Sequence, residues 1–173
     1  IDPCREHFPD IPAGTYDDPR TRIVIADGTK FVAETSDRFD VIMVDSTDPI
    51  GPGAVLFTKE FYTDCAKALK PGGVLVTQNG LPFLQSGELV QSVGFFRSLF
   101  KDAYAFLATT PSYFGGPMSY GWASDNPKLR HRKVGRIERR YEEAGSFPTR
   151  YWRPDVHVAA FALPNYVRDL VQA

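Results

Sequence analysis

The sequence predicts an α/β protein built on a mostly parallel sheet. Short apolar runs alternate with segments of helical periodicity, which is typical of β–α–β units around a parallel sheet. The first runs are continuously apolar, as expected of strands buried on both faces. Each of these runs ends in an aspartate. At 173 residues the chain has the length of one such domain.

The first half of the chain alternates strand, strand, helix and strand. Strands are predicted at 23–26 (IVIA) and 41–44 (VIMV). A helix is predicted from Thr58 to Lys70, because its apolar residues share one face, Thr58 can cap its start, and the Pro-Gly-Gly run at 71–73 stops it. The next strand is predicted at 74–77.

The second half adds a helix, a hairpin and terminal helices. Apolar residues recur at helical spacing from Leu89 to Phe100. Strands near 104–108 and 120–123 are separated by a turn-rich segment at 111–117, which favours an antiparallel hairpin. The chain is then charged and helical from about 128 to 145, and two helices follow in which Pro154 and Pro164 occupy the first turn.

Composition excludes several classes of protein. The formal net charge is −1, so no basic field would hold nucleic acid. No apolar run approaches the ~20 residues that span a bilayer, and no targeting signal is visible, so a cytoplasmic protein is expected. Two cysteines and three histidines are scattered along the chain and predict neither a disulfide framework nor a metal site.

Polar residues follow three of the predicted strands. Asp27, Asp45 and Gln78 each stand at or just after a strand end. In an open α/β sheet, ligands bind outside the carboxyl ends of the strands, so these residues are expected to line one crevice. The alternative is that strand-end aspartates only cap the following turns or helices.

The stretch from Asp45 to Pro52 (DSTDPIGP) points to a cationic ligand. Asp45 and Asp48 stand three residues apart on a segment stiffened by two prolines. An alkyl diamine is a dication at neutral pH, because its pKa values are about 10, and paired carboxylates attract it. A carboxylate in hydrogen-bond reach of one amine can orient that amine and accept its proton.

Several motifs together resemble the spermidine synthase family, and the resemblance covers nearly the whole chain. DSTDPIGP is the most specific of them, whereas Asp27-Gly28 alone would be weak. The matching segments are 39–44, 45–52, 56–57, 61–62, 71–73, 77–79, 109–116 and 154–164.

The resemblance implies a methyltransferase-like Rossmann fold and aminopropyl transfer from decarboxylated S-adenosylmethionine, as co-substrate, to putrescine. The products would be spermidine and 5′-methylthioadenosine, and no cofactor or metal is implied because a sulfonium is already an activated leaving group. Asp45 would accept the proton of the attacking amine. The residues implied for the polyamine are Asp45, Ser46, Thr47, Asp48, Gln78 and Tyr113, and those for the donor are Asp27, Gly28, Pro52 and Leu56.

Asp155 and His157 also match family positions. Because Pro154 predicts a helix start, Asp155 is interpreted as a favourable first-turn charge, and both residues are left out of the site.

The family also has an N-terminal β domain and a Gly-rich strand-to-helix loop, which are absent from residues 1–173. We therefore expect an incomplete catalytic domain that is inactive alone, in which the strand at 23–26 lacks partners and is displaced or unpaired. The full-length protein is expected to form a homodimer or larger oligomer.

Two other functions remain open. A putrescine N-methyltransferase that uses S-adenosylmethionine would share much of this motif set. A non-catalytic polyamine or nucleoside binder would keep the fold without turnover, although an intact Asp45 and Asp48 argue against it. The residues also leave putrescine, cadaverine, agmatine and spermidine open as acceptors.

Overall fold

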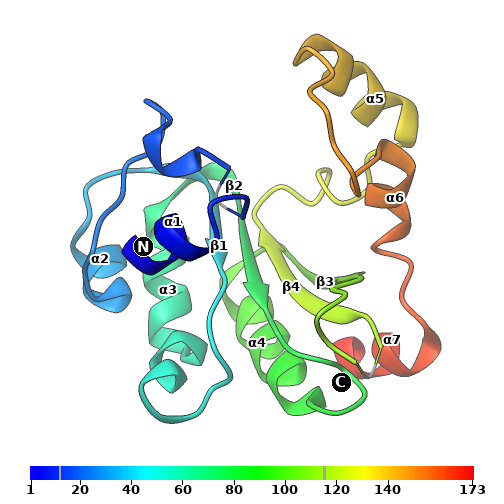
Figure 1. The fold of residues 1–173 in the computed structure, drawn as a ribbon. Coiled ribbons are helices and arrows are strands. Elements are labelled where there is room, and N and C mark those ends of the chain that lie inside the picture. The colour runs from blue at the N-terminus through cyan, green and yellow to red at the C-terminus, as the bar shows by residue number, and fades with distance from the viewer. Residues whose placement is uncertain (12, 115) are drawn as a thin grey trace.

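A computed structural model describes residues 1–11, 13–114 and 116–173 and confirms the α/β class. One four-stranded sheet with the order β1-β2-β4-β3 forms its centre (Figure 1). The strands are β1 (Phe39–Val44), β2 (Leu69–Gln78), β3 (Asp102–Ala108) and β4 (Met118–Ser124).

The sheet is mixed. β1 and β2 run parallel, with Val41 opposite Val74 and Val44 opposite Thr77. β4 is antiparallel to both β2 and β3, so the predicted hairpin of β3 and β4 is confirmed. Because β4 begins beside the end of β2, the loop that precedes β4 lies at the same edge of the sheet as the residues that follow β1 and β2.

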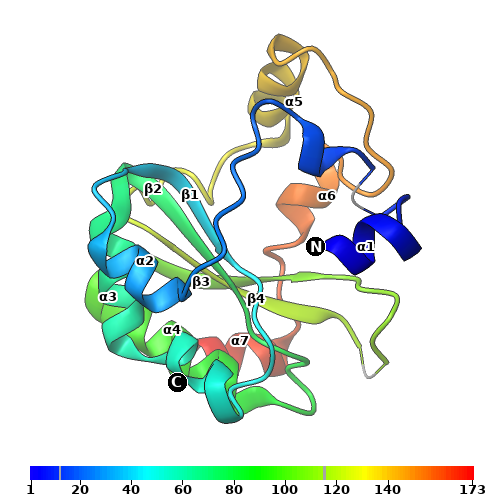
Figure 2. The ribbon, with the colours of Figure 1, turned by 60° about the vertical axis from the view of Figure 1, so that its left-hand side comes forward.

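Four helices cover one face of the sheet, as Figure 2 shows. They are α2 (Gly28–Glu34), α3 (Lys59–Ala68), α4 (Ser86–Leu99) and α7 (Asn165–Gln172). One core cluster joins α3 and α4 to the sheet through Tyr62, Phe96 and Leu75, all fully buried. A second joins α4 to α7 through Leu89 and Val167.

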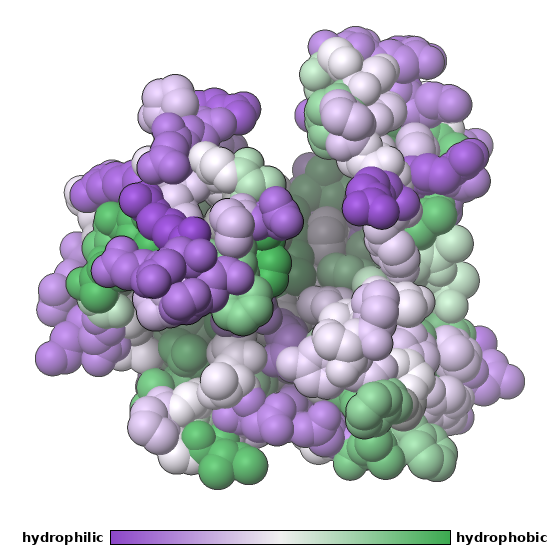
Figure 3. All heavy atoms as spheres, viewed as in Figure 1, coloured by the Kyte–Doolittle hydropathy of each residue, from purple (hydrophilic) through white to green (hydrophobic). Residues whose placement is uncertain are grey.

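The remaining elements are α1 (Asp2–His7), η1 (Thr15–Asp17), η2 (Gly51–Phe57), α5 (Val134–Glu143) and α6 (Pro154–Ala159). Of these elements, η2 packs against α3. Figure 3 shows a deep hollow between the N-terminal segment and the α5–α6 region, with apolar side chains at its base.

The predicted helices form, with three differences in their boundaries. Thr58 caps α3 as predicted, because its hydroxyl accepts a hydrogen bond from the Phe61 amide at 3.3 Å. The helix ends at Ala68, however. Residues 71–73 lie inside β2, where the pairing register of β1 and β2 shifts between Phe39 and Val41. The charged helix is shorter than predicted, 134–143. Pro154 is in the first turn of α6, but Pro164 precedes α7 as its N-cap.

The segment 23–26 does not form the strand that its composition predicts. It is extended coil, and its side chains are exposed, to 84% for Ile25. No strand lies beside it among the described residues, and β1 forms the edge of the sheet with Met43 77% exposed. An isolated strand gains no ladder hydrogen bonds, so the expectation that this segment would be unpaired is met.

Candidate functional site

The ends of β1 and β2 bring Asp45 and Gln78 together. Val44 pairs with Thr77 in a parallel ladder, so Asp45 and Gln78 are the next residues after the same residue pair. Neighbouring strands lie about 4.8 Å apart. The predicted proximity of these two residues at the carboxyl edge therefore follows from the register.

Asp45 also lines a cavity of about 380 Å³ at the free edge of β1. Gly28 and Leu56, two of the predicted donor-binding residues, line the same cavity. The rest of the wall is apolar apart from the thiol of Cys65, whose pKa is raised to about 12 by burial. We name this space the edge cavity; its other lining residues are Phe31, Val32, Phe39, Val41, Ile42, Met43, Val44 and Phe61.

Asp27 stands at the N-terminus of α2 next to Gly28. Its carboxylate accepts hydrogen bonds from the backbone amides of Thr29 (2.9 Å) and Lys30 (3.2 Å) and from the Thr29 hydroxyl (2.6 Å). The hydroxyl of Thr29, and then the amide of Lys30, lower the pKa of the Asp27 carboxyl. Asp27 thus caps α2, and its side chain is not in the lining of the edge cavity.

The segment after Asp45 is a tight turn. The amide of Ile50 donates to the carbonyl of Asp48 at 2.7 Å, and a Cβ on Gly53 would approach the Thr47 hydroxyl to 2.6 Å. Asp48 is exposed, whereas the Ser46 hydroxyl is buried without a hydrogen-bond partner. Pro52 lies in the first turn of η2, which carries Leu56 to the edge cavity.

Gln78 is 9% exposed, and its side-chain oxygen is buried without a partner. Such a buried acceptor is costly unless a ligand or water donates to it. Tyr113 lies in the loop between β3 and β4 with 54% of its surface exposed. The antiparallel register puts that loop at the same edge of the sheet as Gln78, but Asp48, Gln78 and Tyr113 are not in the lining of the edge cavity.

Sequence reasoning missed Asn79, which fixes the backbone next to Gln78. Its side-chain oxygen accepts from the Thr77 hydroxyl (2.7 Å) and the Gly121 amide (2.8 Å), and its side-chain amide donates to Ser92 Oγ (2.8 Å). The Ser92 hydroxyl also bonds Tyr62 OH at 2.9 Å. The Thr-Gln-Asn run is a signal that could have identified it, since a buried amide after a strand needs partners.

Glu88, in the first turn of α4, was also missed. Its Oε2 is buried without a partner, and a Cβ on Gly80 would lie 3.0 Å from that oxygen. Burial, and then the charge of Asp48, raise the pKa of the Glu88 carboxyl. Its spacing from Asp48 in sequence is too large for any local pattern to have indicated it.

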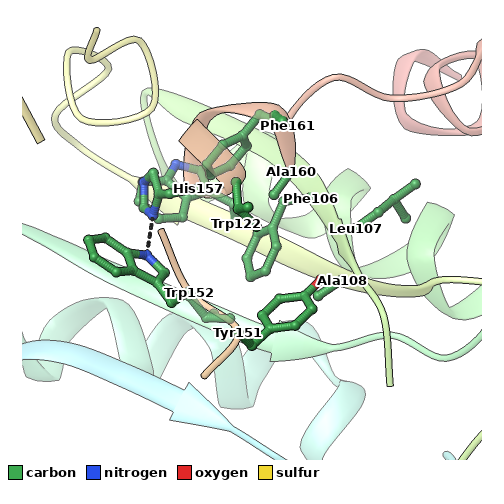
Figure 4. A pocket seen from close by; sticks show the side chains of 12 residues that line it. Phe106, Leu107, Ala108, Trp122, Tyr151, Trp152, His157, Ala160 and Phe161 are labelled. Atoms are coloured by element: carbon green, nitrogen blue, oxygen red, sulfur yellow. Dashed lines mark hydrogen bonds between the residues drawn. The ribbon is translucent and has the colours of Figure 1, made fainter. Parts of the chain in front are cut away.

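A second cavity, of about 460 Å³, lies between the sheet and α6. Aromatic side chains from β3, β4 and the segment before α6 surround it, including Phe106, Trp122 and Trp152 (Figure 4). His157 Nδ1 accepts from Trp152 Nε1 at 3.3 Å, and burial lowers the pKa of His157. The neutral imidazole that results is consistent with a packing role for His157.

Among the described residues, no group of three or more His, Cys, Asp and Glu side chains could hold a metal ion. None of the helices that the structure describes is long and apolar enough to cross a membrane.

Comparison with known proteins defines the class. Residues 1–133 match the family model of the spermine/spermidine synthase domain. The chain is 51% identical to a polyamine aminopropyltransferase of Ruegeria sp. over 170 residues, covering 98% of this chain and 60% of that protein. It is 47% identical to the polyamine aminopropyltransferase of Pectobacterium carotovorum, covering 98% and 58%.

Solved structures agree with this assignment. Spermidine synthase in complex with the transition-state analogue AdoDATO matches with a TM-score of 0.87 and 33% identity, over 99% of this chain and 57% of that one. Spermidine synthase from Thermotoga maritima matches with a TM-score of 0.84 and 33% identity, over 99% and 56%. These neighbours confirm the methyltransferase-like fold.

The chain belongs to the spermine/spermidine synthase family. It spans about 60% of the length of the curated relatives it matches. That further parts of the catalytic domain lie outside this sequence stays a prediction.

Proposed function

We propose that this chain provides the acceptor-binding edge and part of the donor pocket of a polyamine aminopropyltransferase. The enzyme transfers the aminopropyl group of decarboxylated S-adenosylmethionine to putrescine. The observation that carries the proposal is the position of Asp45, which lines the apolar edge cavity and follows the same rung of the sheet as Gln78.

The proposed donor site is the edge cavity. Its apolar wall around Leu56 suits a purine, and Gly28 offers backbone groups at the start of α2. Asp27 would contact the adenine from the cap position, and Pro52 would add apolar contact at the start of η2. A neighbour that binds the analogue AdoDATO supports a ligand of this class.

The proposed reaction is a direct displacement. The amine nitrogen of putrescine forms a bond to the aminopropyl carbon that carries the sulfonium, and the carbon–sulfur bond breaks with its electron pair left on sulfur. The thioether product, 5′-methylthioadenosine, is neutral. Asp45 accepts the proton of the attacking amine, because a carboxylate in hydrogen-bond reach can orient that amine and take up its proton as the carbon–nitrogen bond forms. Asp48, Ser46, Thr47, Gln78 and Tyr113 hold the rest of the diamine.

The test uses the intact protein with both sulfonium donors and several amines, with products identified by mass. Aminopropyl transfer is expected with decarboxylated S-adenosylmethionine; methyl transfer from S-adenosylmethionine would instead support the N-methyltransferase alternative. Asp45→Asn should lower the rate of the chemical step by about 10²–10⁴-fold while donor affinity is retained. A loss of less than about tenfold in the rate of the chemical step would rule out Asp45 as the base.

A further inference from the structure

Unpartnered buried acceptors gather at the carboxyl edge of the sheet. Four buried side-chain polar atoms in the described part of the chain have no hydrogen-bond partner. Three of them lie at the end of β2 or in the segments that follow β1 and β2, on Gln78, Ser46 and Glu88. Gln78 Oε1 can only accept hydrogen bonds, and so can Glu88 Oε2 when the Glu88 carboxyl is ionised. Together they offer acceptors to a ligand with several N–H donors.

Glu88 is held close to this edge by its neighbours. Its Oε2 lies against Gly80, two residues after Gln78, and its Oε1 accepts from Gln85 Nε2 at 3.5 Å. Asn79 Nδ2 donates to the Glu88 carbonyl at 3.5 Å. The carboxylate is therefore tied to the same backbone that positions Gln78.

The loop that carries Asp48 lies beside the same helix. Pro49 lines a cavity together with Gln91, which is one turn after Glu88 on α4. This packing places Asp48 near the first turn of α4, in agreement with the effect of its charge on Glu88. Two carboxylates and a buried amide oxygen thus stand at the carboxyl ends of β1 and β2 and at the start of α4.

We propose that Glu88 is a third carboxylate of the acceptor site, which binds the distal ammonium of the diamine together with Asp48 and Gln78. The inference rests on the proposed function. Asp45 receives the attacking amine beside the donor pocket, and the pair of Asp48 and Glu88 binds the opposite end of the same molecule. Glu88 thereby selects a dication over a monoamine, because an ammonium supplies three donors and a charge where an alkyl end supplies neither.

The experiment compares putrescine with n-butylamine, which has the same carbon chain but lacks the distal ammonium. In the intact protein, Glu88→Gln is expected to lower kcat/KM for putrescine roughly tenfold or more, which is the value of a charge-assisted hydrogen bond. The kcat/KM for n-butylamine and the KM for the donor should stay unchanged. Glu138→Gln, the same change on the exposed surface of α5, serves as the control.

Glu88→Asp separates this role from a helix-terminal charge. The shorter side chain keeps the negative charge in the first turn of α4, so a merely structural role would leave the preference for putrescine intact. A ligand contact would be weakened by the lost methylene, and the preference would fall. An unchanged preference in both variants, or an equal loss with both amines, would overturn the assignment of Glu88.

Failure of the proposed function gives a different result. If the wild-type protein transfers an aminopropyl group to neither amine, the proposed function is wrong. Calorimetric titration with putrescine then tests whether Glu88 contributes to diamine binding. Weaker putrescine binding by Glu88→Gln than by Glu138→Gln would support the subsite. Equal binding by the two variants, or no binding to the wild type, would refute it.

Discussion

Asp102→Asn is expected to destabilise the protein strongly, because Asp102 is the buried partner of an arginine. Its carboxylate accepts from Arg130 Nη2 at 2.7 Å and Nε at 3.0 Å, and from Trp122 Nε1 at 3.1 Å. The side chains of Asp102 and Arg130 are only 7% and 16% exposed. Arg130 also stacks over the ring of Tyr104 at 4.2 Å.

The size of the effect follows from what the amide cannot replace. An asparagine oxygen can still accept from Trp122, but its NH₂ group faces a guanidinium that has donors only. The guanidinium is then a buried charge without its counter-ion, and breaking such a pair from one side costs about 3–5 kcal/mol. Because Asp102 begins β3 and Arg130 follows β4, the loss loosens the connection between the hairpin and α5.

Asp155→Asn is the matched control. It removes the same charge from another Asp–Arg pair, with Arg153 at 3.1 Å, but these side chains are 57% and 74% exposed. Water replaces the lost contact there, so the stability should stay close to that of the wild type. The free energy of unfolding is measured for both variants in the intact protein by urea titration.

A second comparison tests the cause. Arg130→Met combined with Asp102→Asn should be less destabilising than Asp102→Asn alone, because the double variant leaves no unpaired charge. A loss below about 1 kcal/mol for Asp102→Asn, or a loss equal to that of Asp155→Asn, would refute the reasoning.

Three further predictions concern other parts of the chain. Asn79→Ala removes three short buried hydrogen bonds and should lower the unfolding free energy by about 3 kcal/mol in urea titration; a value near zero would contradict the network. Because burial lowers the pKa of His157 below its ordinary 6.5, unfolding takes up a proton, and stability should fall as the pH drops below about 6.5. His157→Phe should lose that part of the pH dependence, and an identical slope in both proteins would show that His157 does not contribute. The isolated 173-residue chain should self-associate in light scattering through the exposed edge around Val41 and Met43, while a monomer that melts cooperatively would contradict this.

Much of the fold follows from local sequence signals. Thr58 caps α3 through its own hydroxyl, and the spacing from Leu89 to Phe96 forms one buried face of α4. These features depend on residues within one or two turns of each other, so the sequence predicts them reliably. The aspartates after strand-like runs likewise predicted a site at the carboxyl edge, and the register of β1 and β2 brings Asp45 beside Gln78.

Other features depend on partners that are distant in sequence. Residues 23–26 have the composition of a buried strand but form no ladder, because pairing requires a neighbour and none lies beside them in the described structure. Pro71 lies within β2 because β1 tolerates an irregularity there, which no local rule predicts. The burial of Glu88 and the bonds of Asn79 arise only when α4, β4 and the end of β2 meet. Sequence alone therefore determined which residue types stand at the strand ends, and the tertiary structure decided which of them are buried together, since burial and hydrogen bonding depend on packing between separate elements.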